Sequence, residues 1–124
     1  MKGDNIILEK SYNFALRIIK LYQHLRTQKV ERELIIQLLK SGTSIGSNAE
    51  EAVGAQSRSD FIHKAGIAYK ESRETLYWLR LFKDADIIDE KLAQSFLSDA
   101  EELKKILSSI LENYKRNQLV NMVS

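Results

Sequence analysis

LLKSGTSIGSNAEEAVG, from Leu38 to Gly54, is the stretch that decides the fold of this chain. At helical spacing its apolar and small residues form one seam, in alternating steps of four and three residues. The seam comprises Ile35, Leu38, Gly42, Ile45, Ala49 and Ala52. Gly42 and Gly46 each cost a helix roughly 1 kcal/mol relative to alanine, so a compensating contact is expected. We therefore predict that another helix approaches this stretch closely.

A polar row flanks this seam on the same predicted helix. It consists of Ser44, Asn48 and Glu51, which share one side of the helix. One interpretation is a contact surface for a ligand or nucleic acid. The interpretation we prefer is a polar network that fixes the register against the next helix, with a lysine or arginine paired to Glu51. The partners expected on the next helix are Lys70, Ser72, Arg73 and Thr75.

Length and composition indicate one soluble globular domain, spanning residues 1–124. The chain has 124 residues, of which 44% are hydrophobic and 29% charged, and its formal net charge is +2. It contains no proline, so long uninterrupted helices are permitted. It also contains no cysteine, which excludes disulfides, thiolate metal sites and a cysteine nucleophile.

Apolar periodicity predicts four helices, at about 5–26, 30–53, 59–83 and 89–116. Short connections separate them, and we expect the tail NQLVNMVS to fray because it lacks a clear period. Four helices joined by short turns favour an antiparallel up-down-up-down four-helix bundle. The predicted fold class is therefore all-α.

Apolar side chains cover more of the predicted 5–26 helix than one bundle core needs. Beside the seam through Phe14 and Ile18 runs a second apolar line, about 100° round the helix. A helix that is apolar on two sides contacts more than its own domain, so we predict self-association. The candidate interface residues are Tyr12, Ile19, Tyr22, Trp78 and Leu81.

Basic and aromatic side chains follow one line of the predicted 59–83 helix, and a basic strip follows the 5–26 helix. Guanidinium groups pair with phosphates and phenol rings stack on bases, so these lines form a candidate nucleic-acid surface. Its residues are Lys10, Arg17, Lys20, Lys70, Arg73, Tyr77 and Arg80. The alternative is a solvated face, in which Lys70 pairs with Glu74 and Arg80 with Asp84.

Acidic residues concentrate between positions 84 and 102, where seven of them accompany a single lysine, Lys91. Such an asymmetry can orient partners or stack subunits. The interpretation we prefer is that the carboxylates favour the dipole at the start of the last helix.

Motifs for catalysis, cofactors and membranes are missing from the sequence. His24 and His63 have no metal-ligand partner four residues away, and no serine lies in a nucleophile motif. The glycines at 42–46 lack the lysine of a phosphate-binding loop. We therefore expect neither an enzyme nor a bound cofactor or metal. With no signal peptide and no apolar span, the expected location is the cytoplasm, away from membranes.

Two stretches of this sequence resemble a known family. SGTSIGSNAEEA (41–52) and DFIHKAGIAYKESRETLYWLRLF (60–82) are similar to the helix-two and helix-three signatures of the 23S ribosomal RNA intervening-sequence proteins. These are four-helix bundle proteins, related to the accessory variability protein of diversity-generating retroelements. The chain departs from the family pattern at Gly66, Tyr69 and the pair Ala49-Glu50.

The resemblance implies a cytoplasmic bacterial protein that forms a ring-shaped homopentamer and has no established enzymatic activity. The retroelement relative binds nucleic acid and a reverse transcriptase through a basic surface. Two functions are therefore open for this chain. One is an accessory factor that binds RNA, DNA or a nucleic-acid-handling protein, and the other is a protein-interaction scaffold without nucleic-acid binding.

Overall fold

This computed structural model describes residues 2–123, with side chains from residue 6 onward. Four helices and the short turns that connect them make up this range. They are α1 (Lys2–Arg26), α2 (Arg32–Val53), α3 (Arg58–Asp84) and α4 (Glu90–Val123). Within these residues there is no strand, so the predicted all-α fold class is confirmed.

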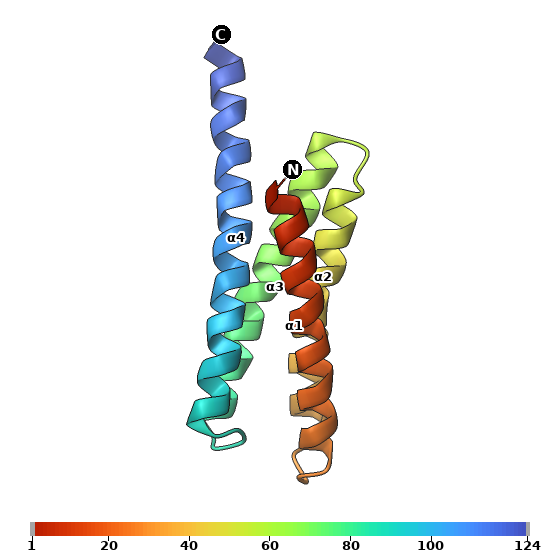
Figure 1. Cartoon of the computed structure of the whole chain (residues 1–124), viewed down its shortest axis with the longest axis vertical. Helices are drawn as coiled ribbons and strands as arrows, with labels where there is room; N and C mark the ends of the chain where they lie inside the picture. The colour runs from red at the N-terminus through yellow and green to blue at the C-terminus, as the bar shows by residue number, and fades with distance from the viewer. Residues whose placement is uncertain (1, 124) are drawn as a thin grey trace.

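The helices are arranged as a bundle in which neighbours in sequence are neighbours in space. The chain reverses direction at each connection, and both ends lie at the same end of the molecule (Figure 1). Helix α1 packs against α2 and α4, and α3 packs against the same two helices. Within residues 2–123, the backbones of the diagonal pairs, α1 with α3 and α2 with α4, do not come close.

Local sequence signals fix the ends of the helices. The Ser57 hydroxyl accepts a hydrogen bond from the Asp60 backbone N–H at 3.0 Å and caps α3. The Asp89 carboxylate accepts one from the Leu92 N–H at 2.7 Å at the start of α4. Part of the acidic run at 84–102 therefore stabilises a helix start, as the sequence indicated.

The glycines of α2 face α1 at very short range. A Cβ atom added to Gly42 would lie 2.8 Å from Cγ1 of Ile18, and one added to Gly46 would lie 3.3 Å from the backbone oxygen of Ser11. Ile18 and Ser11 are both only 1% exposed. The predicted close approach is therefore present, and α1 is the helix that makes it.

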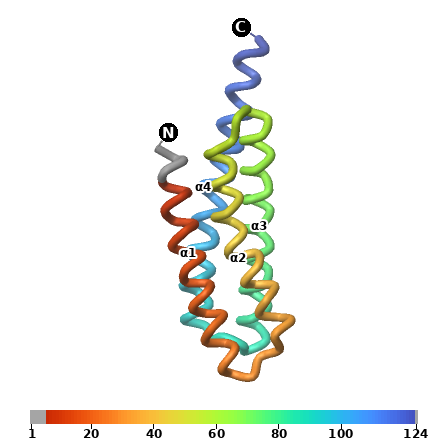
Figure 2. Tube along the Cα trace, turned by 90° about the vertical axis from the view of Figure 1, so that its right-hand side faces the viewer, coloured from red at the N-terminus to blue at the C-terminus, as the bar shows by residue number. Residues whose placement is uncertain are grey.

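The last helix is longer than the sequence predicted. We expected it to end near residue 116, but α4 continues to Val123 and its end extends past the other helices (Figure 2). No glycine or proline follows Gly66, so nothing in the backbone ends the helix early. The last turns are held by helical bonding rather than by burial, since Leu119 is 63% and Met122 82% exposed.

Two glycine-to-alanine variants test the α1–α2 contact. Gly42→Ala gains helix propensity, worth about 1 kcal/mol, but overpacks a closed site, which costs about 1–3 kcal/mol. We expect a net loss of about 1 kcal/mol in the free energy of unfolding. A Cβ on Gly66 meets nothing within 4 Å, so Gly66→Ala should gain up to about 1 kcal/mol.

Chemical denaturation of both variants at one protein concentration measures the difference. Equal stabilisation by the two substitutions would show that α1 does not lie against Gly42.

Candidate functional site

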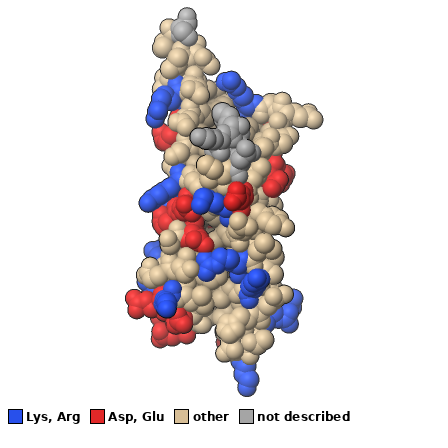
Figure 3. Space-filling view, in the orientation of Figure 1, with Lys and Arg blue, Asp and Glu red and all other residues tan. Residues whose placement is uncertain are grey.

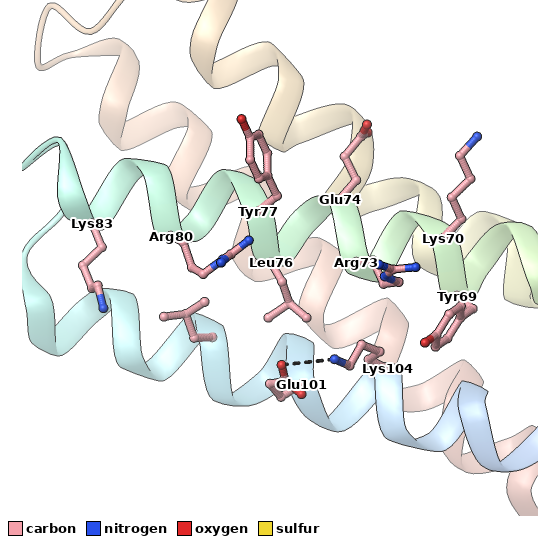
Figure 4. Close-up of a pocket in the computed structure, with 11 residues that line it drawn as sticks. Tyr69, Lys70, Arg73, Glu74, Leu76, Tyr77, Arg80, Lys83, Glu101 and Lys104 are labelled. Atoms are coloured by element: carbon pink, nitrogen blue, oxygen red, sulfur yellow. Dashed lines mark ion pairs between the residues drawn. The ribbon is translucent and has the colours of Figure 1, made fainter.

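A groove of about 870 Å³ runs between α3 and α4. Its lining is basic and aromatic above an apolar floor, and it comes from these two helices alone (Figure 4). The lining residues are Tyr69, Lys70, Arg73, Glu74, Leu76, Tyr77, Arg80, Lys83, Leu97, Glu101 and Lys104. The four residues that the sequence placed on one line of the 59–83 helix, Lys70 to Arg80, thus lie in one groove.

The α3 side chains that line the groove point in two directions. Arg80 and Lys83 point from α3 toward α4, whereas Lys70, Glu74 and Tyr77 stand at the outer rim of α3 and point away from α4 (Figure 4). Leu76, which is 8% exposed, and the half-buried Leu97 lie between the helices. The arrangement therefore places cations around an apolar floor.

Positive charge dominates the groove. Five of its residues are cationic and two are carboxylates, and Lys104 pairs with Glu101 at 3.4 Å. Among the side chains of residues 6–123, Lys70, Arg73, Arg80 and Lys83 have no ion-pair partner within 4.0 Å. The alternative pairs Lys70–Glu74 and Arg80–Asp84 are not formed. These four cations are available to bind anions.

Tyr77 presents an aromatic face beside these cations. Its side chain is 49% exposed. The ring meets Trp78 edge-on, with centroids 5.5 Å apart, and the Arg80 guanidinium carbon lies 6.0 Å from its centroid. The tyrosine is thus held by neighbours while about half of its surface remains exposed.

The basic strip of α1 does not extend the groove, contrary to the sequence interpretation. Lys10 pairs with Glu102 at 3.2 Å, and Arg17 pairs with Asp99 at 2.6 Å. On the face seen in Figure 3, acidic and basic side chains lie next to one another where α1 adjoins α4. The acidic residues of α4 neutralise these cations because α1 and α4 are neighbours.

Arg17 also contributes packing at this junction. One of its amino groups donates to the Ser95 hydroxyl at 3.0 Å, and its guanidinium carbon lies 4.1 Å from the centre of the Phe96 ring. Lys20 is exposed on the same side of α1, next to Arg17 and His24 rather than at the α3–α4 groove. Arg17 therefore joins two helices in this structure.

The polar row on α2 does not form the predicted network with α3. The Asn48 side-chain amide donates to the backbone oxygen of Ser44 at 2.9 Å, within its own helix. Ser72 and Thr75 likewise donate to backbone oxygens of α3. Glu51 does pair with a lysine, Lys64 at 3.0 Å, but its side chain is 57% exposed. Bonding within each helix therefore satisfies Asn48, Ser72 and Thr75. The expected lysine partner of Glu51 is present on α3, as an exposed pair.

The candidate interface residues fall into two groups. Tyr12, Ile19 and Leu81 are exposed, at 63%, 39% and 40%. Tyr22 and Trp78 are instead half-buried and pack against the core of their own chain. The sequence interpretation missed Leu16, which is 45% exposed and lies between Tyr12 and Ile19 on α1.

Trp78 and Glu71 are further polar groups of α3 in partly buried surroundings. The indole Nε1–H of Trp78 is buried and has no acceptor within the described range, residues 6–123. Burial raises the pKa of Glu71 above its usual value, with a further increase from nearby Glu74 and a partial offset from Lys70. Neither group lines the groove between α3 and α4.

Tyr69, Lys83 and Lys104 are among the groove residues that the sequence interpretation missed. Lys83 follows Arg73, Leu76 and Arg80 in steps of three and four, so the same heptad count could have found it. Tyr69 lies one such step before Arg73. Lys104 comes from α4, and its place depends on the register between two helices, which spacing within one helix does not give.

Neither a metal site nor a membrane span is evident in the part of the chain that the structure describes. No group of three or more potential metal-binding side chains comes together among residues 6–123, and His24 and His63 are both exposed. None of the helices is long and apolar enough to cross a membrane.

The fold and the groove define a small all-α bundle protein, and comparison with known proteins gives its family. The 23S rRNA-intervening sequence protein family matches residues 3–109. A protein with unknown function from the S23 ribosomal protein family of Bacteroides thetaiotaomicron, with a crystal structure at 1.70 Å, is 44% identical. The match covers 89% of this chain and 98% of that one, with a TM-score of 0.86. No curated protein gave a match.

This chain therefore belongs to the 23S rRNA-intervening sequence protein family, as the resemblance of its two central helices indicated. The family match ends at residue 109, so the exposed last turns of α4 lie beyond it.

A pair of α1 variants tests the assignment of Arg17 to the bundle. Arg17→Ala removes an ion pair, a hydrogen bond and a contact with an aromatic ring, so we expect the free energy of unfolding to fall by about 1 kcal/mol. Lys10→Ala removes one exposed ion pair and should cost only a few tenths of a kcal/mol, roughly. Urea denaturation measures both. If Arg17→Ala were no more destabilising than Lys10→Ala, the bridging role of Arg17 would be rejected.

Proposed function

We propose that this protein is a non-enzymatic, homo-oligomeric accessory factor that binds nucleic acid through the groove between α3 and α4. The observation that carries the proposal is the set of four unpaired cations, Lys70, Arg73, Arg80 and Lys83, gathered in one groove. A phosphate backbone supplies regularly spaced negative charges to such a set. The family description, which refers to an intervening sequence of 23S rRNA, also supports an RNA-related role.

Electrostatics accounts for the expected binding. The net charge of +2 is small because the cations of α1 are balanced by the carboxylates of α4. The local charge of the groove therefore indicates nucleic-acid binding better than the net charge of the chain does. Arginine guanidinium groups bind phosphate in two-pronged geometry, and each contact releases counterions from the nucleic acid. Affinity should then fall steeply as salt rises.

The groove is better suited to binding than to catalysis. No histidine or cysteine lines it, and of its two carboxylates Glu101 is paired with Lys104 while Glu74 stands at the outer rim, away from α4. A family neighbour from Bacteroides thetaiotaomicron is described as a protein with unknown function, so its description names no reaction to compare with this groove. We place the protein in the bacterial cytoplasm, where RNA is available.

Self-association is the second part of the proposal. Tyr12, Leu16 and Ile19 follow steps of four and three residues on α1, so their exposed side chains form one apolar strip. A strip of this kind on a small soluble protein indicates an interface. By the resemblance of the chain to its family, we propose that the oligomer is a pentameric ring.

A charge-matched pair of double variants tests the nucleic-acid proposal. Arg73→Ala with Arg80→Ala removes two groove cations, whereas Arg32→Ala with Lys40→Ala removes two exposed cations from α2. We expect the groove variant to bind a fluorescent single-stranded RNA about tenfold or more weakly at low salt. The slope of log affinity against log salt concentration should be smaller in magnitude by about 1.4, because two phosphate contacts are lost. The α2 variant should bind as the unaltered protein does. Fluorescence anisotropy at several salt concentrations measures both quantities.

Equal binding by the two double variants would remove the groove from consideration. Absence of RNA and DNA binding by the unaltered protein at low salt would favour the other candidate function, a protein-interaction scaffold.

Light scattering tests the oligomer. The unaltered protein should have a mass of about five times the 14.3 kDa of one chain. Ile19→Asp buries a charge in the proposed interface, so it should shift the mass toward that of one chain. Val53→Lys replaces a side chain of similar exposure at the end of α2 and should leave the mass unchanged. A single-chain mass for the unaltered protein at all concentrations would contradict self-association.

A further inference from the structure

We infer that the groove between α3 and α4 selects single-stranded over duplex nucleic acid, with a base stacked on Tyr77. This inference rests on the proposed nucleic-acid binding and adds the class of ligand. Three features of the groove support it: its width, its apolar floor and the exposed tyrosine at its rim.

The width of the groove excludes a duplex from its interior. Helices α3 and α4 pack against each other, so the groove is a furrow on the surface between them, with Leu76 and Leu97 at its floor. A double helix is wider than a furrow between two neighbouring helices, so it can touch only the rims. A single strand is narrow enough to lie along the furrow and to reach the unpaired cations of α3.

The floor and the rim offer contacts that only unpaired bases can use. Leu76 and Leu97 form an apolar strip between the cations. Tyr77 adds an aromatic residue that is 49% exposed at the rim. In a duplex the base faces are already stacked on one another, and only phosphates, sugars and base edges point outward. The apolar and aromatic surface would therefore contribute to binding a single strand and contribute little to binding a duplex.

The cations are spaced to follow a strand along α3. Lys70 and Lys83 are thirteen residues apart, which corresponds to about 20 Å along a helix, and Arg73 and Arg80 lie between them. Tyr77 lies between the two arginines in sequence. A strand whose phosphates bind Arg73 and Arg80 therefore passes the tyrosine ring. This combination of a basic groove and an aromatic platform is the general form of single-strand binding sites.

Matched oligonucleotides of about 12 nucleotides, as single strands and as duplexes, provide the test. Anisotropy of labelled oligouridylate and oligothymidylate, and of RNA and DNA duplexes of the same length, gives the affinities at about 50 mM salt. We expect single strands to bind about tenfold or more tightly than duplexes. The RNA and DNA arms identify which source of single strand is preferred.

Substitutions of Tyr77 test the stacked base directly. Tyr77→Ala should weaken single-strand binding about tenfold and leave duplex binding unchanged, because stacking is lost while every cation remains. Tyr77→Phe keeps the ring and should bind a single strand nearly as the unaltered protein does. Circular dichroism and thermal melting check that both variants are folded, which is expected for an exposed position.

The outcomes separate this inference from the function on which it rests. Duplexes that bind as tightly as single strands, or a Tyr77→Ala variant that loses nothing, would overturn the inference and leave nucleic-acid binding standing. Failure of every oligonucleotide to bind would overturn both.

Discussion

The contact between α1 and the glycines of α2 is the constraint on which the rest of the bundle depends. Gly42 and Gly46 carry no side chain, so Ile18 comes closer to α2 than a Cβ on Gly42 would allow, and the backbone of Ser11 lies where a Cβ on Gly46 would be tightly packed. Both glycines lower helix propensity, and the packing of α1 offsets that cost. The two helices approach closely there, and the position of α1 relative to the other helices follows from this contact.

The close packing of α1 on α2 accompanies a different kind of contact on the other side of α1. There, large and charged side chains span the distance to α4, and Arg17 reaches Asp99 while Phe14 meets Phe96 edge-on with centroids 6.2 Å apart. The ion pairs between these helices occupy Lys10 and Arg17 of α1 and Glu102 and Asp99 of α4. The α3 cations Lys70, Arg73, Arg80 and Lys83 have no ion-pair partner among the described side chains, residues 6–123, which is why the groove between α3 and α4 is the basic one.

Periodicity within one helix was enough to predict the helices, their order and the line from Lys70 to Arg80. It was not enough to predict which charges meet, because that depends on the register between helices. Arg17 belonged to a basic strip in the sequence, but Asp99 of α4 pairs with it. Asn48 was placed in a cross-helix network, yet its own helix supplies the acceptor. The length of α4 was underestimated because a helix can continue without a buried face.

The most direct test follows the arginine side chains by nitrogen-15 NMR while a short single-stranded RNA is added. It asks whether the unpaired cations of α3 form the binding surface. Because Arg73 and Arg80 are unpaired and Arg17 is paired with Asp99, we expect the Nε resonances of Arg73 and Arg80 to shift and that of Arg17 to stay in place. A shift of the Arg17 resonance without movement of Arg73 and Arg80 would contradict it.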